Sequence, residues 1–292
     1  MELKRFHPSM IGEGEMVLSV GKKKTGKTTG LFDIIYEKRD TPEWVAFCGT
    51  ANSNEALEHV MPSAFIHDGW NSEVMKSIIM HKEQRNYKRR RTGKKRLWTG
   101  VIIDDCAFDP KFFRDSTLKQ VTMNSRWIGF SPTVITTQYP VTFHPSVLSQ
   151  FDWFVLHREI TQNNRRRLFD HYFPLDDFKL FNAIMDVATA DWGALVIRNS
   201  GTSNRVEDNI FAWRPTIRDW HVNPRQKPWK LGSRSFWAFH HKNYNDRWHE
   251  RRAEEQKSVT KQSGVKKRAL IRIEPPMRDE EEEPPRKKSR KR

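Results

Sequence analysis

The segment GKKKTGKT at residues 21–28 is the feature that most constrains the fold of this chain. It matches the pattern GxxxxGK[ST], follows the apolar run 16–20 directly, and leads into an amphipathic stretch at 28–37. In this pattern glycines let a loop close around phosphates, and the amides at the head of the next helix face the anion. We therefore predict a strand, a phosphate-binding loop and a helix in that order. A surface Gly-Lys turn is the alternative, and it would not require the strand and the helix.

Six residues of this loop are predicted to contact a bound nucleotide. They are Gly21, Thr25, Gly26, Lys27, Thr28 and Thr29. We expect Lys27 to reach the β and γ phosphates of ATP and the Thr28 hydroxyl to bind Mg²⁺. The loop needs the backbone amides of residues 22–24, so we expect their lysine side chains to be solvated or close to nucleic acid.

Two adjacent carboxylates follow a second apolar run in VIIDD, residues 101–105. Hydrolysis requires a carboxylate at the end of a strand that neighbours the loop, so Asp104 is predicted to hold Mg²⁺ and Asp105 to take the proton of the attacking water. Gln138 ends the apolar strand 133–137 and is predicted to contact the γ-phosphate or that water. An exposed turn is the alternative for the two acids, and an ordinary polar strand end is the alternative for Gln138.

Apolar, strand-like runs alternate with helical patterns as far as residue 214. The runs lie at 16–20, 44–50, 97–103, 133–137, 151–157, 192–198 and 209–214. Short, continuously apolar strands separated by helices predict an α/β domain with a mainly parallel central sheet covered by helices on both faces. We expect this domain to span 1–219, a Trp- and His-rich extension at 220–250 to pack on the domain or on a partner, and 251–292 to be a disordered charged tail.

The positive charge of the chain is concentrated in two places. The net charge is +16; residues 82–96 contain nine Lys or Arg and one Glu, and residues 251–292 contain fifteen Lys or Arg and eight acids. Such local clusters predict a polyanionic partner, and 82–96 is expected to be a loop that follows the backbone of DNA, although a solvated loop has the same composition. The clusters at 266–268 and 286–292 fit equally a nuclear localisation signal and a nucleic-acid-binding arm.

The two cysteines, Cys48 and Cys106, lie in apolar segments without the spacing of a metal site. We interpret them as reduced core thiols of an intracellular protein. No apolar run approaches the length of a membrane span, and the first ten residues lack the apolar core of a signal peptide, so no membrane partner is expected.

An ordered set of segments over about residues 14–215 resembles the FtsK/HerA-type DNA-packaging ATPases of poxviruses and other large DNA viruses. The segments are GKKKTGKT, WVAFCGT, FIHDGW, VIIDDCAFD, SRWIGFSPTVITTQYP, FDWFVLHRE and TADWGALVI. The resemblance implies a RecA/FtsK-like P-loop NTPase fold with ATP and Mg²⁺ as cofactors. It assigns Lys27 and Thr28 to phosphate and Mg²⁺, Asp104 and Asp105 to the Walker B pair, and Gln138 to the sensor.

The resemblance also implies partners: a homo-oligomeric ring, with a hexamer favoured, that drives double-stranded DNA into a preformed capsid through a capsid or portal-vertex protein. An arginine that acts on the neighbouring subunit's nucleotide would be Arg126 or Arg158, although a surface arginine is the simpler interpretation of each.

The sequence therefore predicts a DNA-translocating ATPase for viral genome packaging. The alternatives are a nucleotide-regulated DNA-binding virion protein without motor activity and a P-loop nucleoside or nucleotide kinase. The expected location is a cytoplasmic virus factory or the nucleus of the host, with association to the virion.

Overall fold

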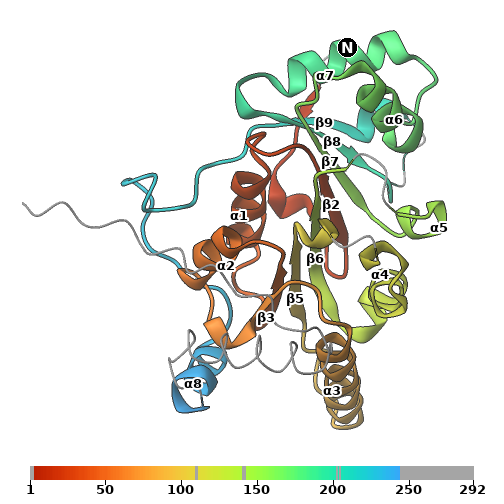
Figure 1. Cartoon of the computed structure of the whole chain (residues 1–292). Coiled ribbons are helices and arrows are strands. Elements are labelled where there is room, and N and C mark those ends of the chain that lie inside the picture. The colour runs from red at the N-terminus through yellow and green to blue at the C-terminus, as the bar shows by residue number, and fades with distance from the viewer. Residues whose placement is uncertain (1–2, 109–110, 140–142, 202, 204, 244–292) are drawn as a thin grey trace, which may run out of the picture. The chain divides into compact units, whose positions relative to one another are not determined.

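A computed structural model of the chain describes residues 3–108, 111–139, 143–201, 203 and 205–243 (Figure 1). The chain divides into two units, 1–245 and 246–292. The predicted charged tail at 251–292 lies outside the described residues, and the predicted boundaries at 219 and 250 stay predictions.

The first unit is built on one nine-stranded sheet in the order β1-β9-β8-β7-β2-β6-β5-β3-β4. The strands are β1 (Lys4–Arg5), β2 (Met16–Val20), β3 (Glu43–Cys48), β4 (Ile66–Asp68), β5 (Thr99–Asp104), β6 (Phe130–Thr137), β7 (Trp153–His157), β8 (Ala194–Arg198) and β9 (Ile210–Trp213). The pairs β7–β8 and β8–β9 are antiparallel, and the other pairs are parallel. The predicted mainly parallel sheet is confirmed.

Helices cover both faces of this sheet (Figure 1). They are α1 (Lys27–Glu37), α2 (Ala51–Glu58), α3 (Ser72–Arg91), α4 (Ser116–Ile128), α5 (Pro145–Leu148), α6 (Gln162–Tyr172), α7 (Phe178–Ala188) and α8 (Arg234–Asn243). Side chains of a strand alternate between the faces, so Val17 belongs to the core cluster that includes residues of α1 and α2, while Leu18 belongs to the cluster that includes residues of α3, α4, α6 and α7. Every residue of β2, β5 and β7 is buried, which explains why these strands read as continuous apolar runs.

The prediction that residues 82–96 form a loop is wrong for residues 82–91, because α3 continues as a helix to Arg91. Glu, Gln, Lys and Arg all have good helix propensity, and a run of charged side chains does not by itself end a helix. The helix is also anchored there: Glu43 accepts hydrogen bonds from the buried Lys82 at 3.2 Å and from Arg85 at 2.5 Å. The helix ends before Gly93, which has a φ of +68°. The charges therefore lie on a helix end and the turn that follows it.

The segment after β9 runs along the face of the sheet that carries α1. Trp229 is buried with its ring edge-on to Tyr36 at 5.2 Å, and the Leu231 amide donates to the Val60 carbonyl at 2.8 Å. Arg218 pairs with Asp33 at 2.7 Å, and its guanidinium lies 4.0 Å from the centre of the Tyr36 ring. These contacts hold the segment after β9 against α1 and against the residues that follow α2.

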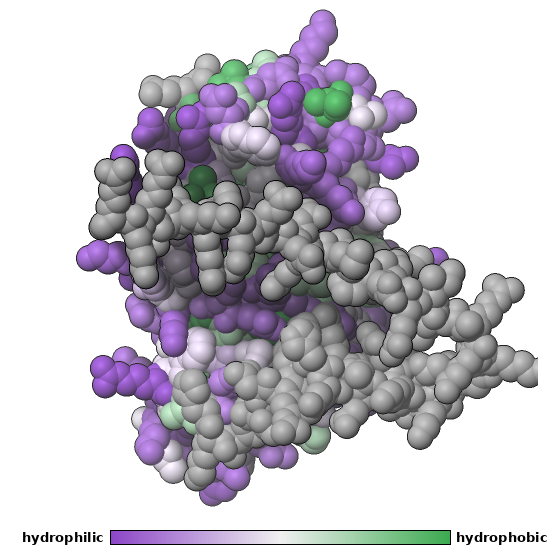
Figure 2. All heavy atoms as spheres, turned by 60° about the vertical axis from the view of Figure 1, so that its left-hand side comes forward, coloured by the Kyte–Doolittle hydropathy of each residue, from purple (hydrophilic) through white to green (hydrophobic). Residues whose placement is uncertain are grey.

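Figure 2 shows that the described surface on this side is mostly hydrophilic, with scattered hydrophobic residues. Within the described ranges, no helix is long and apolar enough to cross a membrane.

Replacing Arg218 with alanine is expected to lower the free energy of unfolding by about 3 kcal/mol, because the buried Asp33 carboxylate loses its guanidinium partner. Arg214→Ala is the matched control, since Arg214 pairs with Asp191 at 3.2 Å on the surface, where an ion pair contributes at most about 1 kcal/mol. Urea denaturation monitored by circular dichroism measures both values. Equal losses in the two variants would contradict the anchoring role of Arg218.

Candidate active site

The loop between β2 and α1 is shaped by its two glycines. Gly26 caps α1 with a φ of +97°, a left-handed conformation that strains other residues. A Cβ atom on Gly21 would lie 2.6 Å from the Cβ of His157. The Gly21 amide donates to the Thr137 carbonyl at 3.0 Å, which ties the loop to the end of β6. The strand, loop and helix predicted from GKKKTGKT are all present.

Lys27 turns its ammonium group into this loop. The Nζ atom donates to the Gly21 carbonyl at 2.5 Å, and the side chain is buried. Burial lowers the pKa of Lys27, while the negative charges of Asp105 and Asp104 act to raise it. The loop therefore encloses a cation that faces the two carboxylates.

The Asp104 carboxylate is held by two hydroxyl groups. Ser53, in the first turn of α2, donates to one carboxylate oxygen at 2.5 Å, and Thr136 of β6 donates to the other at 2.5 Å. Asp104 is buried at the end of β5. Sequence reasoning missed both hydroxyl residues, although Thr136 lies within the polar end of the strand 133–137.

Asp105 has a strained backbone with a φ of +50°, which is uncommon for a residue other than glycine. Its amide donates to the Thr136 hydroxyl at 3.1 Å, and the Gln138 side-chain amide donates to its carboxylate. A Cβ atom on Gly49 would lie 2.1 Å from the Asp105 carbonyl oxygen, so only glycine fits beside this turn. Gln138 thus contacts the second acid directly.

Strand β6 lies between β2 and β5, so the expectation that the acids end an immediate neighbour of the loop strand is wrong. The pairing Val20 with Thr137 and Ile103 with Ile135 nevertheless brings the carboxyl ends of all three strands to one edge of the sheet. Lys27, Asp104, Asp105 and Gln138 meet at this edge.

The remaining loop threonines lie beside this cluster. Thr28 is exposed in the first turn of α1, and Thr29 is half-buried. The Thr25 hydroxyl donates to the Lys22 carbonyl at 2.8 Å, so it braces the loop itself.

The two candidate arginines lie at opposite ends of the parallel strands. Arg126, in the last turn of α4, packs against Gly14 ahead of β2, so it does not reach the nucleotide loop of its own chain. Arg158 directly follows β7 at the loop edge and lines a cavity of about 610 Å³ together with Arg165 and Asp191. Their action on a neighbouring subunit stays a prediction.

His157, which sequence reasoning missed, lies under the loop. Its Nε2 atom is 2.9 Å from the Ser19 hydroxyl, and its Nδ1 atom is 3.2 Å from the Thr25 carbonyl oxygen. A carbonyl only accepts hydrogen bonds, so the proton lies on Nδ1. Burial, followed by the nearby Lys27 ammonium, lowers the pKa of His157 to about 4. The sequence signal was a polar residue at the end of an otherwise apolar strand.

The lysines at 22–24 are exposed, as expected, and Lys22 is in addition paired with an acid. Its Nζ atom lies 2.7 Å from a carboxylate oxygen of Glu159, which follows β7. Burial acts to raise the pKa of Glu159, but hydrogen bonds from Lys22, the Thr161 amide and Asn164 lower it overall. This lysine therefore links the loop to the segment that follows β7.

The turn Ala190–Trp192 borders the loop on its other side. The Trp192 carbonyl oxygen lies 3.5 Å from the position of a Cβ atom on Gly26, and Asp191 and Trp192 both have a positive φ. The Trp192 side chain is 68% exposed, which leaves an aromatic ring at the rim of the loop.

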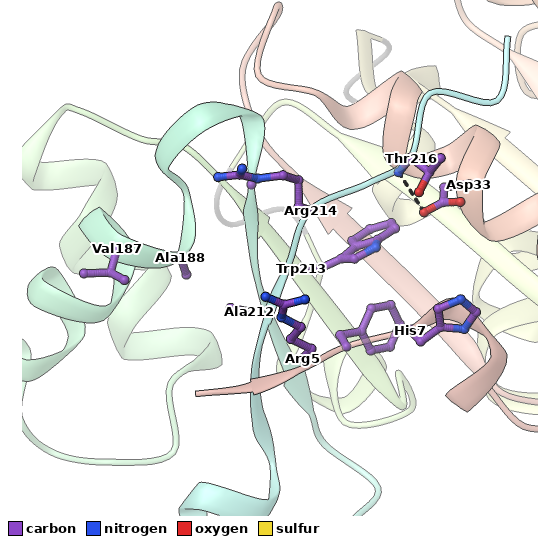
Figure 3. A pocket seen from close by; sticks show the side chains of 11 residues that line it. Arg5, His7, Asp33, Val187, Ala188, Ala212, Trp213, Arg214 and Thr216 are labelled. Carbon is purple, nitrogen blue, oxygen red and sulfur yellow. Dashed lines mark hydrogen bonds between the residues drawn. The ribbon is translucent and has the colours of Figure 1, made fainter. Parts of the chain in front are cut away.

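A cavity of about 500 Å³ lies beside this turn, lined by Arg5, Trp213 and Arg214 among others (Figure 3). Arg5 enters it from β1, and Arg214 comes from the end of β9. The cavity therefore presents two cationic side chains next to an indole ring.

No family model matches the chain. It is 30% identical over 213 residues to the uncharacterized protein 088R of Invertebrate iridescent virus 3. The aligned region covers 72% of this chain and 79% of that protein. The chain belongs to the family of this viral protein. The uncharacterized protein L437 of Acanthamoeba polyphaga mimivirus is 24% identical over 84% of both chains.

Among solved structures, the genome packaging NTPase B204 of Sulfolobus turreted icosahedral virus 2, in complex with AMPPCP, is similar over 70% of this chain and 99% of its own. The identity is 13% and the TM-score is 0.48.

Acid is expected to destabilise the folded chain through His157. Its pKa is about 4 when folded and near 6.5 when unfolded, so protons bind the unfolded chain preferentially as the pH falls from 6.5 toward 4. The loss is about 2 kcal/mol at pH 5. Urea denaturation at pH 7 and pH 5 should show a smaller pH dependence in His157→Gln than in wild type.

The exposed His171 supplies the control for this measurement. His171→Gln should keep the pH dependence of wild type. His67, whose pKa burial also lowers to about 4, contributes alike to all three chains. An unchanged pH dependence in His157→Gln would contradict the neutral, buried imidazole.

Proposed function

We propose that the chain is an ATPase motor that translocates double-stranded DNA, and that its task is the packaging of a viral genome into capsids. One observation carries the proposal: a loop lysine, an acid pair and an amide side chain meet at the carboxyl edge of a parallel sheet, at the head of a helix. This arrangement suits a nucleoside triphosphate, because the loop amides and Lys27 attract its phosphates while Asp105 supplies a base.

Each residue has a defined task in this proposal. Lys27 exchanges its hydrogen bond to the Gly21 carbonyl for the β and γ phosphates of ATP. The water oxygen attacks the γ phosphorus, the bond to the bridging oxygen of ADP breaks, and the Asp105 carboxylate takes the proton of the water. The hydrogen bond from Gln138 keeps that carboxylate in position. The exposed ring of Trp192 is proposed to stack on the nucleobase.

The donor set also fits Mg²⁺, which prefers oxygen ligands. Thr28 and Asp104 would hold it, with Asp104 acting through water, and Ser53 and Thr136 orient the carboxylate for that purpose. When bound, the ion neutralises charge on the phosphates.

The proposed DNA contact is the basic end of α3 and the turn after it. The turn is held in place because Arg89 donates to the Lys95 carbonyl at 2.7 Å and Arg96 donates to the Arg126 carbonyl. The exposed side chains of this surface include Tyr87, Lys88, Arg90, Arg91, Lys94 and Lys95. This surface lies at the amino edge of the sheet, opposite the nucleotide loop, so DNA and ATP would not compete for space.

The ring and the capsid contact belong to the same proposal. Support comes from the resemblance to FtsK/HerA-type packaging ATPases and from membership in a family that includes a protein of an iridescent virus. In this ring, Arg126 or Arg158 would act on the nucleotide of a neighbouring subunit. A virion protein that only binds nucleotide, or a kinase that needs an acceptor, would not release phosphate from ATP faster when DNA is added.

Lys27→Ala is expected to abolish ATP hydrolysis, because the phosphates lose the cation in the loop. Asp105→Asn should keep ATP binding but lower kcat by about 10²- to 10⁴-fold, since an amide cannot take the proton. Phosphate release and equilibrium binding of a fluorescent ATP analogue separate the two effects. Lys119→Ala, on the exposed side of α4, is the control and should match wild type. Near-normal turnover in Asp105→Asn would remove Asp105 as the base.

Replacing Lys88, Arg90, Arg91, Lys94 and Lys95 with serine is expected to weaken duplex binding and flatten its salt dependence. Each phosphate contact contributes about −0.9 to the slope of log K against log salt, so loss of at least two contacts should reduce the slope by about 2 units or more. Basal ATP hydrolysis should persist while its stimulation by DNA falls.

A variant of equal charge change serves as the control for that experiment. It replaces the exposed Lys119, Lys179, Arg205, Arg225 and Lys227 with serine. Both variants keep the full chain, so the contribution of residues 251–292 is common to them. An equal slope in the two variants would show that the end of α3 is not the DNA contact.

A further inference from the structure

A second cluster of chemistry-bearing side chains lies away from the nucleotide loop, between the end of α2 and the extension. His59, Asp219 and His221 each offer one ligand atom, and these atoms all lie within 4.8 Å of one another. We propose that these three residues bind a divalent transition-metal ion such as Zn²⁺, and we call them the clip site.

The clip site is assembled from two segments far apart in the sequence. His59 is the C-cap residue of α2, whereas Asp219 and His221 belong to one turn, in which the His221 amide donates to an Asp219 carboxylate oxygen at 2.9 Å. The His59 and His221 rings have centroids 4.4 Å apart with an interplanar angle of 47°. The turn therefore presents a carboxylate and an imidazole together toward a third ligand on α2.

The donor set selects the class of metal. Two imidazoles and one carboxylate, with a water in the fourth position, form a known ligand set for Zn²⁺, whereas Mg²⁺ and Ca²⁺ prefer oxygen ligands alone. Neighbouring ligands of a tetrahedral zinc lie roughly 3.4 Å apart, as follows from metal–ligand distances of about 2.1 Å. His59 and His221 are exposed, so small ring rotations can bring the donors to that spacing.

The position of the clip site gives the metal a structural task. Trp220 lies between its two turn ligands in the sequence, and its ring is edge-on to the buried Trp229 at 6.3 Å. The opposite end of α2 carries Ser53, which holds Asp104. A bound metal would thus join the extension to the helix that orients the predicted Mg²⁺ ligand, and binding to the folded state alone should raise Tm.

The test is calorimetric titration of the untagged full chain with Zn²⁺ alone. We expect one zinc per chain at this site and a Tm that rises by a few degrees with zinc. His59→Gln and His221→Gln should each weaken binding by about tenfold or more. Asp219→Asn retains an acceptor for the His221 amide, so it should lose affinity without losing the turn.

His171→Gln, on the exposed face of α6, should bind zinc like wild type. Lys27→Ala should also bind zinc like wild type, because this substitution is expected to abolish only ATP hydrolysis. Co²⁺ should give a visible spectrum without thiolate charge-transfer bands, since Cys48 and Cys106 are buried elsewhere. The proposal is overturned if wild type shows no such binding, or if His59→Gln and His221→Gln bind zinc as tightly as His171→Gln.

Discussion

The burial of the Lys27 ammonium group is the constraint on which the rest of the candidate active site depends. Removing a cation from water is costly unless other groups compensate, and here loop carbonyls and two carboxylates provide that compensation. The loop can close around the ammonium only because Gly21 and Gly26 permit close approach and a left-handed turn. The carboxylates can face it only because β2, β6 and β5 are in register at their carboxyl ends.

Local patterns in the sequence were sufficient for much of the fold and for the central members of the site. The phosphate loop, the acid pair and Gln138 each follow a recognisable apolar strand, so their arrival at one edge of a parallel sheet could be predicted. The basic helix end could not be placed from its charge alone, because Lys and Arg have good helix propensity and α3 continues to Arg91.

Strand order escaped prediction for a different reason. The place of β6 between β2 and β5, and the antiparallel pairing of β8, are set by contacts between residues far apart in the chain. His157 and Thr136 act through such contacts as well: each is a single polar residue at a strand end, and its partners become visible only in three dimensions.

The two outermost strands of the sheet have a consequence for assembly. β1 has two residues, both exposed and basic, and β4 has three and ends in an acid, Asp68. Short edges with charged side chains disfavour the addition of a strand from another chain. In the proposed ring, contacts between subunits would therefore be made by helices and loops rather than by a sheet continuous across the subunits.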